Sequence, residues 1–297
     1  MPHRILVSGG CKGNRLGYAT RSPLRTDIPP PTPSAAVLVL GAPLSRYRSA
    51  ARTDVGMKRE HNEDSFLVNE ALGLFVVCDG MGGHAGGETA SRVASETVER
   101  ELLAARDRAG SPFAQEAPLE QAQLADALRG AIQAACAAVY RASLADAELQ
   151  GMGTTLVALL ARGEVALVGH VGDSRAYLVR DGDVAQLTED HSLVNEQVRA
   201  GLLSADEARY SRLRNIITRS VGFEEDVVVD LVGLETKKGD RFVLCSDGLS
   251  NLVEADEIGG VLLHARSPEP ACGELVAIAN DRGGDDNITV IVAERLE

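Results

Sequence analysis

Four short acidic motifs lie at the ends of apolar runs in this sequence. They are Asn62-Glu63-Asp64, Asp79-Gly80, Asp247-Gly248 and Asp285-Asp286-Asn287. A carboxylate at the end of a buried strand loses its hydration, which costs free energy unless something positive meets it. A divalent cation meets that need, because hard cations bind carboxylate and carbonyl oxygens. The motifs therefore predict a metal site built from strands that lie far apart in the sequence.

Asp173 and Arg59 are further candidates for the same site. Asp173 is another carboxylate at a strand end, although its segment alone is typical of a bulged hairpin turn. Arg59 lies five residues before Asp64, and an arginine is most often a solvated surface charge. Beside a cluster of carboxylates and metals, its guanidinium would be suited to bind a phosphate in a two-pronged geometry.

A glycine-rich segment, residues 79–87, follows one of the apolar runs. Its Gly80-x-Gly82-x-x-Ala85 spacing loosely fits the dinucleotide-binding fingerprint. That interpretation is disfavoured because Asp79 would repel a pyrophosphate and because the later strands are expected to be antiparallel. We expect instead that the loop lets a backbone carbonyl reach a cation beside Asp79.

Other catalytic chemistries lack their residues in this sequence. There is no Walker A loop, no Cys-x5-Arg phosphatase loop, and no base partner evident for a serine nucleophile. The histidines show no paired ligand spacing, so we expect them to be structural. The five cysteines have no CxxC spacing, which fits a reducing compartment and predicts a cytoplasmic protein.

The composition is that of a globular protein with a strongly acidic balance. The 297 residues are 44% hydrophobic and 25% charged, enough for a sizeable core. A formal net charge of −13 argues against nucleic acid or an acidic membrane as partner. No apolar run reaches the ~18 residues of a membrane span, and a signal peptide is disfavoured.

The charge is unevenly distributed along the chain. Residues 1–52 hold eight Lys and Arg against one Asp, a balance of +7, so the remaining 22 basic and 42 acidic residues give −20. We predict that residues 1–48 are a disordered, basic, Pro-rich arm, with a mis-assigned start as the alternative. Residues 49–297 are then the folded catalytic domain.

Hydrophobic periodicity outlines the elements that must position these residues. Strands are expected at 64–69, 74–79, 154–161, 165–171, 175–179, 184–187, 226–232, 241–246 and 287–293, and helices at 88–109, 118–148, 254–265 and 268–280. Tight turns at 162–164 and 180–183 predict that the four strands from 154 to 187 form an antiparallel meander. Two groups of strands with pairs of helices predict an α+β fold of two packed sheets flanked by helices.

Eight segments in order resemble the bacterial branch of the metal-dependent serine/threonine protein phosphatases, the type 2C or PPM family. The resemblance runs from about residue 49 to 296. The segments are Thr53-Asp54-Val55-Gly56 with Arg59-Glu60-His61-Asn62-Glu63-Asp64-Ser65, Val77-Cys78-Asp79-Gly80-Met81-Gly82-Gly83-His84, Gly153-Thr154-Thr155, Gly172-Asp173-Ser174-Arg175, Leu187-Thr188-Glu189-Asp190-His191-Ser192, Ile217-Thr218-Arg219-Ser220-Val221-Gly222, Ser246-Asp247-Gly248-Leu249 and Asp286-Asn287-Ile288-Thr289.

The resemblance implies a four-layer αββα sandwich and a role for each candidate residue. Asp79 would bridge two Mn2+ or Mg2+ ions, and the Gly80 carbonyl would bind one of them. Asp247 and Asp286 would ligate the other ion. Glu63 and Asp64 would act mainly through metal-bound waters. Asp173 would bind a third, weaker ion, and Arg59 would hold the substrate phosphate.

The implied reaction is hydrolysis of phosphoserine and phosphothreonine in proteins. Two bridged cations lower the pKa of a shared water, which attacks phosphorus without a covalent intermediate. The family further implies a monomer that opposes a bacterial Ser/Thr kinase. A phosphoprotein-binding pseudophosphatase and another two-metal phosphoester hydrolase are the alternatives.

Two positions depart from the family pattern. Met81 stands where eukaryotic members have a histidine proposed as general acid, and Ser211-Arg212 stands where bacterial members commonly have His-Pro in a mobile flap.

Overall fold

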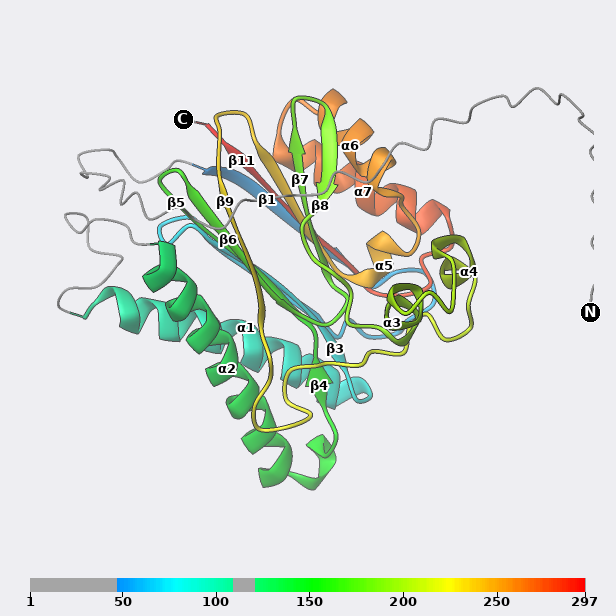
Figure 1. Cartoon of the computed structure of the whole chain (residues 1–297). Coiled ribbons are helices and arrows are strands. Elements are labelled where there is room, and N and C mark those ends of the chain that lie inside the picture. The colour runs from blue at the N-terminus through cyan, green and yellow to red at the C-terminus, as the bar shows by residue number, and fades with distance from the viewer. Residues whose placement is uncertain (1–46, 109–120, 297) are drawn as a thin grey trace, which may run out of the picture. The chain divides into compact units, whose positions relative to one another are not determined.

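The computed structural model of the chain describes residues 47–108 and 121–296, and two antiparallel β-sheets form the centre of this part (Figure 1). The first sheet has the order β1 (Tyr47–Asp54), β11 (Ile288–Arg295), β10 (Arg241–Cys245), β7 (Arg175–Arg180), β8 (Asp183–Gln186). The second has the order β2 (Asp64–Asn69), β3 (Leu74–Met81), β5 (Leu156–Arg162), β6 (Val165–Val171), β9 (Asp230–Glu235), and the short β4 (Gly153–Thr154) pairs with β3.

Helices cover the outer face of each sheet. The long helices α1 (His84–Arg106) and α2 (Gln121–Ala145) pack on the second sheet, and α6 (Ala255–His264) and α7 (Pro268–Asp281) pack on the first (Figure 1). Shorter elements are the 3-10 helix η1 (Ala147–Leu149), α3 (Leu193–Arg199), α4 (Ala205–Arg209) and α5 (Asp247–Ser250).

Three apolar layers hold the sandwich together, and strand β3 shows why. Its Leu74, Val76 and Cys78 side chains belong to the cluster beneath α1 and α2. The alternate residues Phe75 and Val77 belong to the cluster between the two sheets. Because successive side chains of a strand point to opposite faces, an unbroken apolar run is needed where both faces are buried. A third cluster lies between the first sheet and α6 and α7.

The predicted fold class, an α+β sandwich of two packed antiparallel sheets flanked by helix pairs, is confirmed. Most predicted elements are found within a few residues of their expected bounds. Helix α1 begins four residues earlier than expected and includes Gly86 and Gly87, which lie close to Met152 and Glu63. Strand β9 begins at Asp230 instead of 226.

The predicted four-strand meander is wrong. Strands β5 and β6 pair, and so do β7 and β8, but β6 lies in the second sheet and β7 in the first. The chain crosses between the sheets through Gly172-Asp173-Ser174, the segment that taken alone was typical of a hairpin turn. The short connection is possible because β6 ends and β7 begins where the two sheets lie close together (Figure 1).

Strand β1 was not predicted, and its first residue, Tyr47, lies before the expected domain boundary at residue 49. Tyr47 and Arg48, which the prediction placed in the N-terminal arm, are the first residues of β1. The Tyr47 ring is buried between Phe75 and Phe242, with ring centroids 6.0 Å and 6.4 Å away. The rest of the predicted arm lies outside the described residues, so its disorder stays a prediction.

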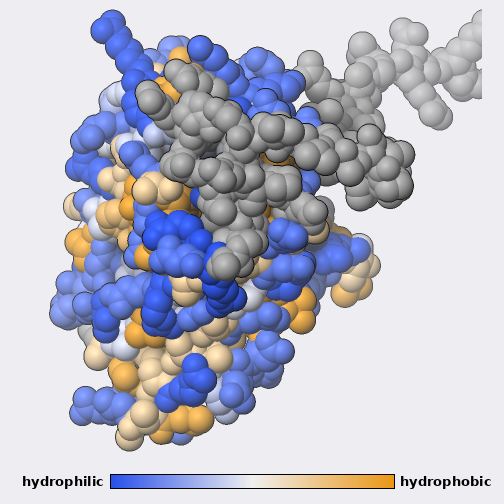
Figure 2. All heavy atoms as spheres, turned by 90° about the vertical axis from the view of Figure 1, so that its left-hand side faces the viewer, coloured by the Kyte–Doolittle hydropathy of each residue, from blue (hydrophilic) through white to orange (hydrophobic). Residues whose placement is uncertain are grey.

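The surface of the described part is mostly hydrophilic on the face shown in Figure 2, where hydrophobic residues form small separate areas. None of the described helices combines the length and the apolar character needed to cross a lipid bilayer.

Candidate functional site

The acidic motifs meet at one end of the sandwich. Asp64 and Asp79 lie directly opposite each other in the β2–β3 pair. Asp247 opens α5 immediately after β10, and Asp286 lies just before β11. Burial raises the pKa of Asp79 well above its ordinary value, and the charges of Asp64, Asp247, Asp173 and Asp286 raise it further. The structure therefore brings together five carboxylates that the sequence places far apart; we call them the carboxylate centre.

The carboxylate centre has buried oxygens that lack partners. Oδ1 of Asp64 and Oδ1 of Asp247 are buried and accept no hydrogen bond from the described residues. Burial raises the pKa of Asp64 to about 7 and that of Asp173 to about 8, and neighbouring aspartates contribute to both shifts. Such oxygens are costly without a compensating positive charge. The donor set, carboxylates with lone pairs aimed at one another, fits a hard divalent cation.

Hydrogen bonds to Thr154 and Thr155 hold the backbone of Asp79 in place. Its N–H donates to the Thr155 hydroxyl (3.0 Å), and its carbonyl accepts from the Thr155 N–H (2.9 Å) and the Thr154 hydroxyl (2.9 Å). Next to it, Gly80 has no room for a Cβ atom, because the carbonyls of Glu63 and Gly87 lie against its Cα. A side chain at position 80 would therefore displace the loop that positions the Gly80 carbonyl.

Asn287 organises the acidic segments, a role that the sequence analysis did not assign. Its Oδ1 accepts from the Glu63 N–H (2.8 Å), and its Nδ2 donates to the carbonyls of Val55 (3.0 Å) and His61 (2.9 Å). The backbone of Asn287 also packs against Gly248 in α5. One amide side chain thus ties the segment 55–63 to the start of β11. Its place in the motif Asp285-Asp286-Asn287 was the available signal.

Ser246 is a second supporting residue that the sequence did not reveal. Its buried hydroxyl donates to Asp64 Oδ2 (2.8 Å) and accepts from the Thr289 N–H (3.0 Å). The hydroxyl proton is therefore directed at a carboxylate of the centre, which leaves Ser246 in a positioning role and not in that of a nucleophile.

Arg59 and the remaining acidic residues lie around the centre with different exposure. The Arg59 guanidinium donates to Asp286 Oδ2 (2.7 Å), and its side chain is 52% exposed. Its other N–H groups face outward enough to reach a phosphate. The Glu63 carboxylate lies against the backbone of Gly87. Asp285 is exposed, as expected for a solvated neighbour.

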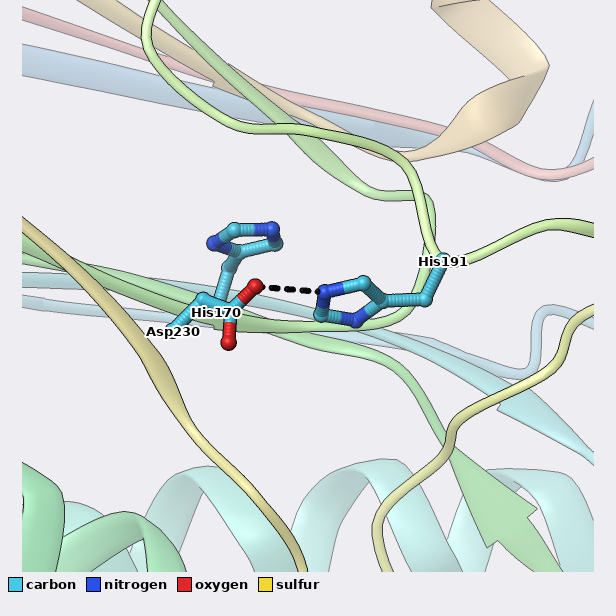
Figure 3. A group of neighbouring side chains, drawn as sticks. All are labelled: His170, His191 and Asp230. Carbon is cyan, nitrogen blue, oxygen red and sulfur yellow. Dashed lines mark hydrogen bonds and ion pairs between the residues drawn. The ribbon is translucent and has the colours of Figure 1, made fainter. Parts of the chain in front are cut away.

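Asp173 sits on the crossover between the sheets, and His191 holds that crossover. Gly172 donates its N–H to His191 Nδ1 (3.0 Å), and the His191 N–H donates to the Gly172 carbonyl (3.0 Å). Because Nδ1 accepts, the ring proton is on Nε2 and is donated to Asp230 Oδ2 (3.0 Å) (Figure 3). Burial lowers the pKa of His191, and the charges of His170 and Arg219 lower it further, so the ring is neutral at pH 7.

The group of His170, His191 and Asp230 has the residue types of a metal site (Figure 3). The rings of His170 and His191 are stacked, with centroids 4.7 Å apart. Arg219 lies 3.0 Å from both His191 Nε2 and Asp230 Oδ1. This fixed guanidinium already balances the Asp230 charge and would repel a cation. We therefore interpret the group as a network that positions the crossover.

The segment 207–215, which resembles the family's flap, overlaps the end of α4 and borders a cavity beside the centre. This cavity has a volume of about 370 Å³, and its lining includes the acidic Asp173 and Asp247 and the basic Arg209 and Arg214. Ser211, one of the two residues that depart from the family pattern, accepts from the Leu213 N–H (3.2 Å) in a tight turn.

Comparison with known proteins gives consistent matches over most of the chain. The family profile of protein phosphatase 2C matches residues 57–267. The serine/threonine phosphatase stp of Listeria welshimeri is 38% identical over 247 residues, which are 82% of this chain and 94% of that protein. The serine/threonine protein phosphatase PstP of Mycobacterium tuberculosis is 37% identical over 250 residues, 84% of this chain and 45% of that protein.

Solved structures agree with these matches. The crystal structure of the Mycobacterium tuberculosis phosphatase PstP/Ppp superposes with a TM-score of 0.75 and 35% identity, covering 84% of this chain and 99% of that one. The catalytic domain of PstP in complex with two manganese ions superposes with a TM-score of 0.73 and 34% identity, with the same coverage of 84% and 99%.

Proposed function

The chain belongs to the protein phosphatase 2C family, and we propose that the carboxylate centre is its two-metal catalytic site. It is a protein-serine/threonine phosphatase that hydrolyses phosphoserine and phosphothreonine in phosphorylated proteins, with Mn2+ or Mg2+ as cofactor. The observation that carries the assignment is the pair of buried oxygens on Asp64 and Asp247 that have no hydrogen-bond partner among the described residues, since these need a cation.

The proposed roles of the ligands are those that the resemblance to the family implies. Asp79, whose charge couples to the other four aspartates, would bridge two ions, and the Gly80 carbonyl would bind one of them. Asp247 and Asp286 would hold the other ion. Glu63 and Asp64 would act through water. Asp173, on the crossover before β7, would hold a third ion. When bound, such ions lower the pKa of a shared water and neutralise phosphoryl oxygens.

The chain's own residues orient the substrate and keep the ligands in place. Arg59 has one N–H group on Asp286 and further N–H groups for the substrate phosphate, where it would offset charge that grows in the transition state. Thr154 and Thr155 fix the backbone of Asp79, and Ser246 fixes the side chain of Asp64. Because these supporting residues lie in a strand or directly beside one, the ligand geometry is preorganised.

We also propose the setting in which the enzyme acts. It works as a monomer in the cytoplasm and removes phosphate that a bacterial Ser/Thr kinase has added. These proposals are supported by the family, by the acidic charge of residues 53–297 and by cysteines that are free and buried at all four described positions.

The test of the metal assignment uses Asp247→Asn with Asp285→Asn as matched control. With Mn2+ present, Asp247→Asn should lower hydrolysis of p-nitrophenyl phosphate and of a phosphothreonine peptide about a thousandfold, because a metal clamp contributes several kcal/mol. Asp285→Asn, a change at the exposed neighbour, should leave both rates within about twofold. Robust activity of the unchanged protein in EDTA would contradict the two-metal mechanism.

A further inference from the structure

A second cavity, with a volume of about 590 Å³, opens beside the carboxylate centre. We call it the Met81 groove: Met81 forms one side, and the segment 217–228 forms the other. Two of its apolar side chains are largely exposed, Phe223 at 70% and Val228 at 68%. Single exposed apolar residues are ordinary on a protein surface, but two at one cavity mark a surface that binds something.

The groove adjoins the catalytic centre through main-chain pairing. Met81 directly follows Gly80, whose carbonyl is a proposed metal ligand. Gly80 pairs with Thr154 in the β3–β4 ladder. Thr154 in turn pairs with Val221, with N–H to carbonyl distances of 3.0 Å and 2.8 Å. The segment that forms the far side of the groove is therefore one strand away from the centre and fixed to it.

Phe223 is held in its exposed position by anchors on both sides. The Gly222 N–H donates to Cys136 Sγ (3.3 Å), and the Cys136 thiol donates to the Glu224 carbonyl (3.2 Å). Gly222 has a φ of +93° and packs directly on Val139 of α2, so no side chain fits there. Because both neighbours of Phe223 are tied to α2, the backbone that carries its ring at the groove is fixed, which lowers the entropic cost of binding a partner there.

The groove is negatively charged on the same side. Glu224, Glu225 and Asp226 are consecutive, exposed, and form no ion pair with the described residues. Arg219, the basic residue of the groove, is already paired with Asp230 (3.0 Å). A partner with a basic side chain beside an apolar one is therefore complementary to this surface.

We propose that the Met81 groove binds the substrate segment that flanks the phosphorylated residue, and that it prefers an apolar side chain next to a basic one. This inference rests on the proposed function, because it places the phosphorylated residue at the carboxylate centre. An extended peptide advances about 3.3 Å per residue. Residues within about four positions of the phosphothreonine can therefore reach a groove that begins one residue from Gly80.

The experiment compares three phosphothreonine peptides that differ only in their flanking residues: Leu and Lys, Ser and Ser, or Leu and Glu. The unchanged protein should hydrolyse the Leu-Lys peptide with the highest kcat/KM. Phe223→Ser should lower kcat/KM for the Leu-Lys peptide about tenfold, mainly through KM, because an apolar contact is lost. The double change Glu224→Lys and Asp226→Lys should reverse the preference to Leu-Glu.

Two controls keep this test independent of the proposed function. Hydrolysis of p-nitrophenyl phosphate with Mn2+ should stay unchanged in every groove variant, because that substrate has no flanking residues. Leu263→Ser, an equally apolar-to-polar change on α6 at a side chain 56% exposed, should leave the peptide preference unchanged. If all variants keep the ranking and the KM values of the unchanged protein, the groove does not bind the substrate. Absence of p-nitrophenyl phosphate hydrolysis in the unchanged protein would instead refute the proposed function.

Discussion

Replacing Asp64 by Asn is expected to stabilise the protein when no metal is bound and to weaken the stabilisation that Mn2+ provides. The Asp64 carboxylate is buried; one oxygen accepts from the Ser246 hydroxyl, and the other has no partner within residues 47–108 and 121–296. An asparagine has the same shape, keeps an acceptor for Ser246, and carries no charge. Its NH2 group would also donate toward the neighbouring carboxylates. The substitution should therefore relieve repulsion that metal ions otherwise neutralise.

The magnitude follows from the pKa of Asp64, which burial raises from 3.8 to about 7. One unit of pKa corresponds to ~1.36 kcal/mol, so ionising Asp64 in the folded, metal-free protein costs up to about 4 kcal/mol. A raised pKa means that the folded state binds the proton more tightly than the unfolded state. Stability of the metal-free protein therefore falls as the pH rises from about 3.8 through about 7.

Urea unfolding in EDTA, followed by circular dichroism, measures this effect. At about pH 8, Asp64→Asn should be more stable than the unchanged protein by up to about 4 kcal/mol, with a rise in Tm of about 2–4 °C per kcal/mol. At about pH 5 the difference should shrink to less than half, because Asp64 is then protonated in the folded state and the pH is only about one unit above its unfolded pKa of 3.8, so the cost of protonating it on folding is small. Asp285→Asn should change neither value, since Asp285 is exposed.

Adding Mn2+ completes the measurement. A ligand at a hundredfold excess over its Kd stabilises by about 2.7 kcal/mol, and Asp64→Asn should gain less than the unchanged protein. The reasoning fails if Asp64→Asn is less stable than the unchanged protein in EDTA at both pH values. That result would mean that the carboxylate contributes native hydrogen bonds that outweigh its burial.

The remaining predictions concern Arg59, His191 and the beginning of β1. Arg59→Lys should raise KM for p-nitrophenyl phosphate about tenfold in steady-state kinetics, because an ammonium cannot bind phosphate in two-pronged geometry; an unchanged KM would remove Arg59 from phosphate binding. His191→Leu should lower kcat more than His191→Asn, because only Asn can still accept from the Gly172 N–H. Because burial lowers the pKa of His191 below 6.5, the neutral ring should stabilise the folded protein above about pH 6.5, and this stabilisation should be lost as the pH falls. Urea unfolding should show this loss for the unchanged protein but not for His191→Asn, and equal pH profiles would contradict it. In calorimetry, a chain that begins at Tyr47 should unfold at the same temperature as the full chain. A chain that begins at Ser49 lacks the buried Tyr47 ring, and its free energy of unfolding should be lower by about 3–5 kcal/mol. An equal loss of stability in both chains would show that residues 1–46 support the fold.

The sequence predicts those parts of the fold where local patterns and burial agree. Strand β3 is an unbroken apolar run, and α1 repeats small and apolar residues at helical spacing, so both were found close to their expected bounds. Strand β1 escaped prediction because Arg48 and Arg52 interrupt its pattern and because its partner β11 lies far away in the sequence. Its strand character comes from pairing with β11, which no local pattern reveals.

The residues of the candidate site also fall into those that the sequence revealed and those that it did not. Charged motifs at strand ends revealed the carboxylates, since a buried charge is conspicuous in an apolar context. Asn287, Ser246 and His191 were not assigned their roles, because an amide, a hydroxyl or a neutral imidazole has no distinctive surroundings in sequence. Their roles depend on partners in distant segments, such as the Val55 carbonyl for Asn287 and Gly172 for His191. The crossover at Asp173 was misread because neighbouring strands usually pair.

The position of β11 makes the enzyme's activity depend on a strand that is synthesised after all the other described elements. This strand is the last described element, yet it lies between β1 and β10 in the first sheet. Asp286 and Asn287 immediately precede it. While the ribosome is still adding these residues, the nascent chain has no partner for β1, no clamp on the Glu63 backbone and an incomplete set of carboxylates. Until β11 has been synthesised, the first sheet and the carboxylate centre are therefore incomplete, and the site can form only after the other described strands have been made.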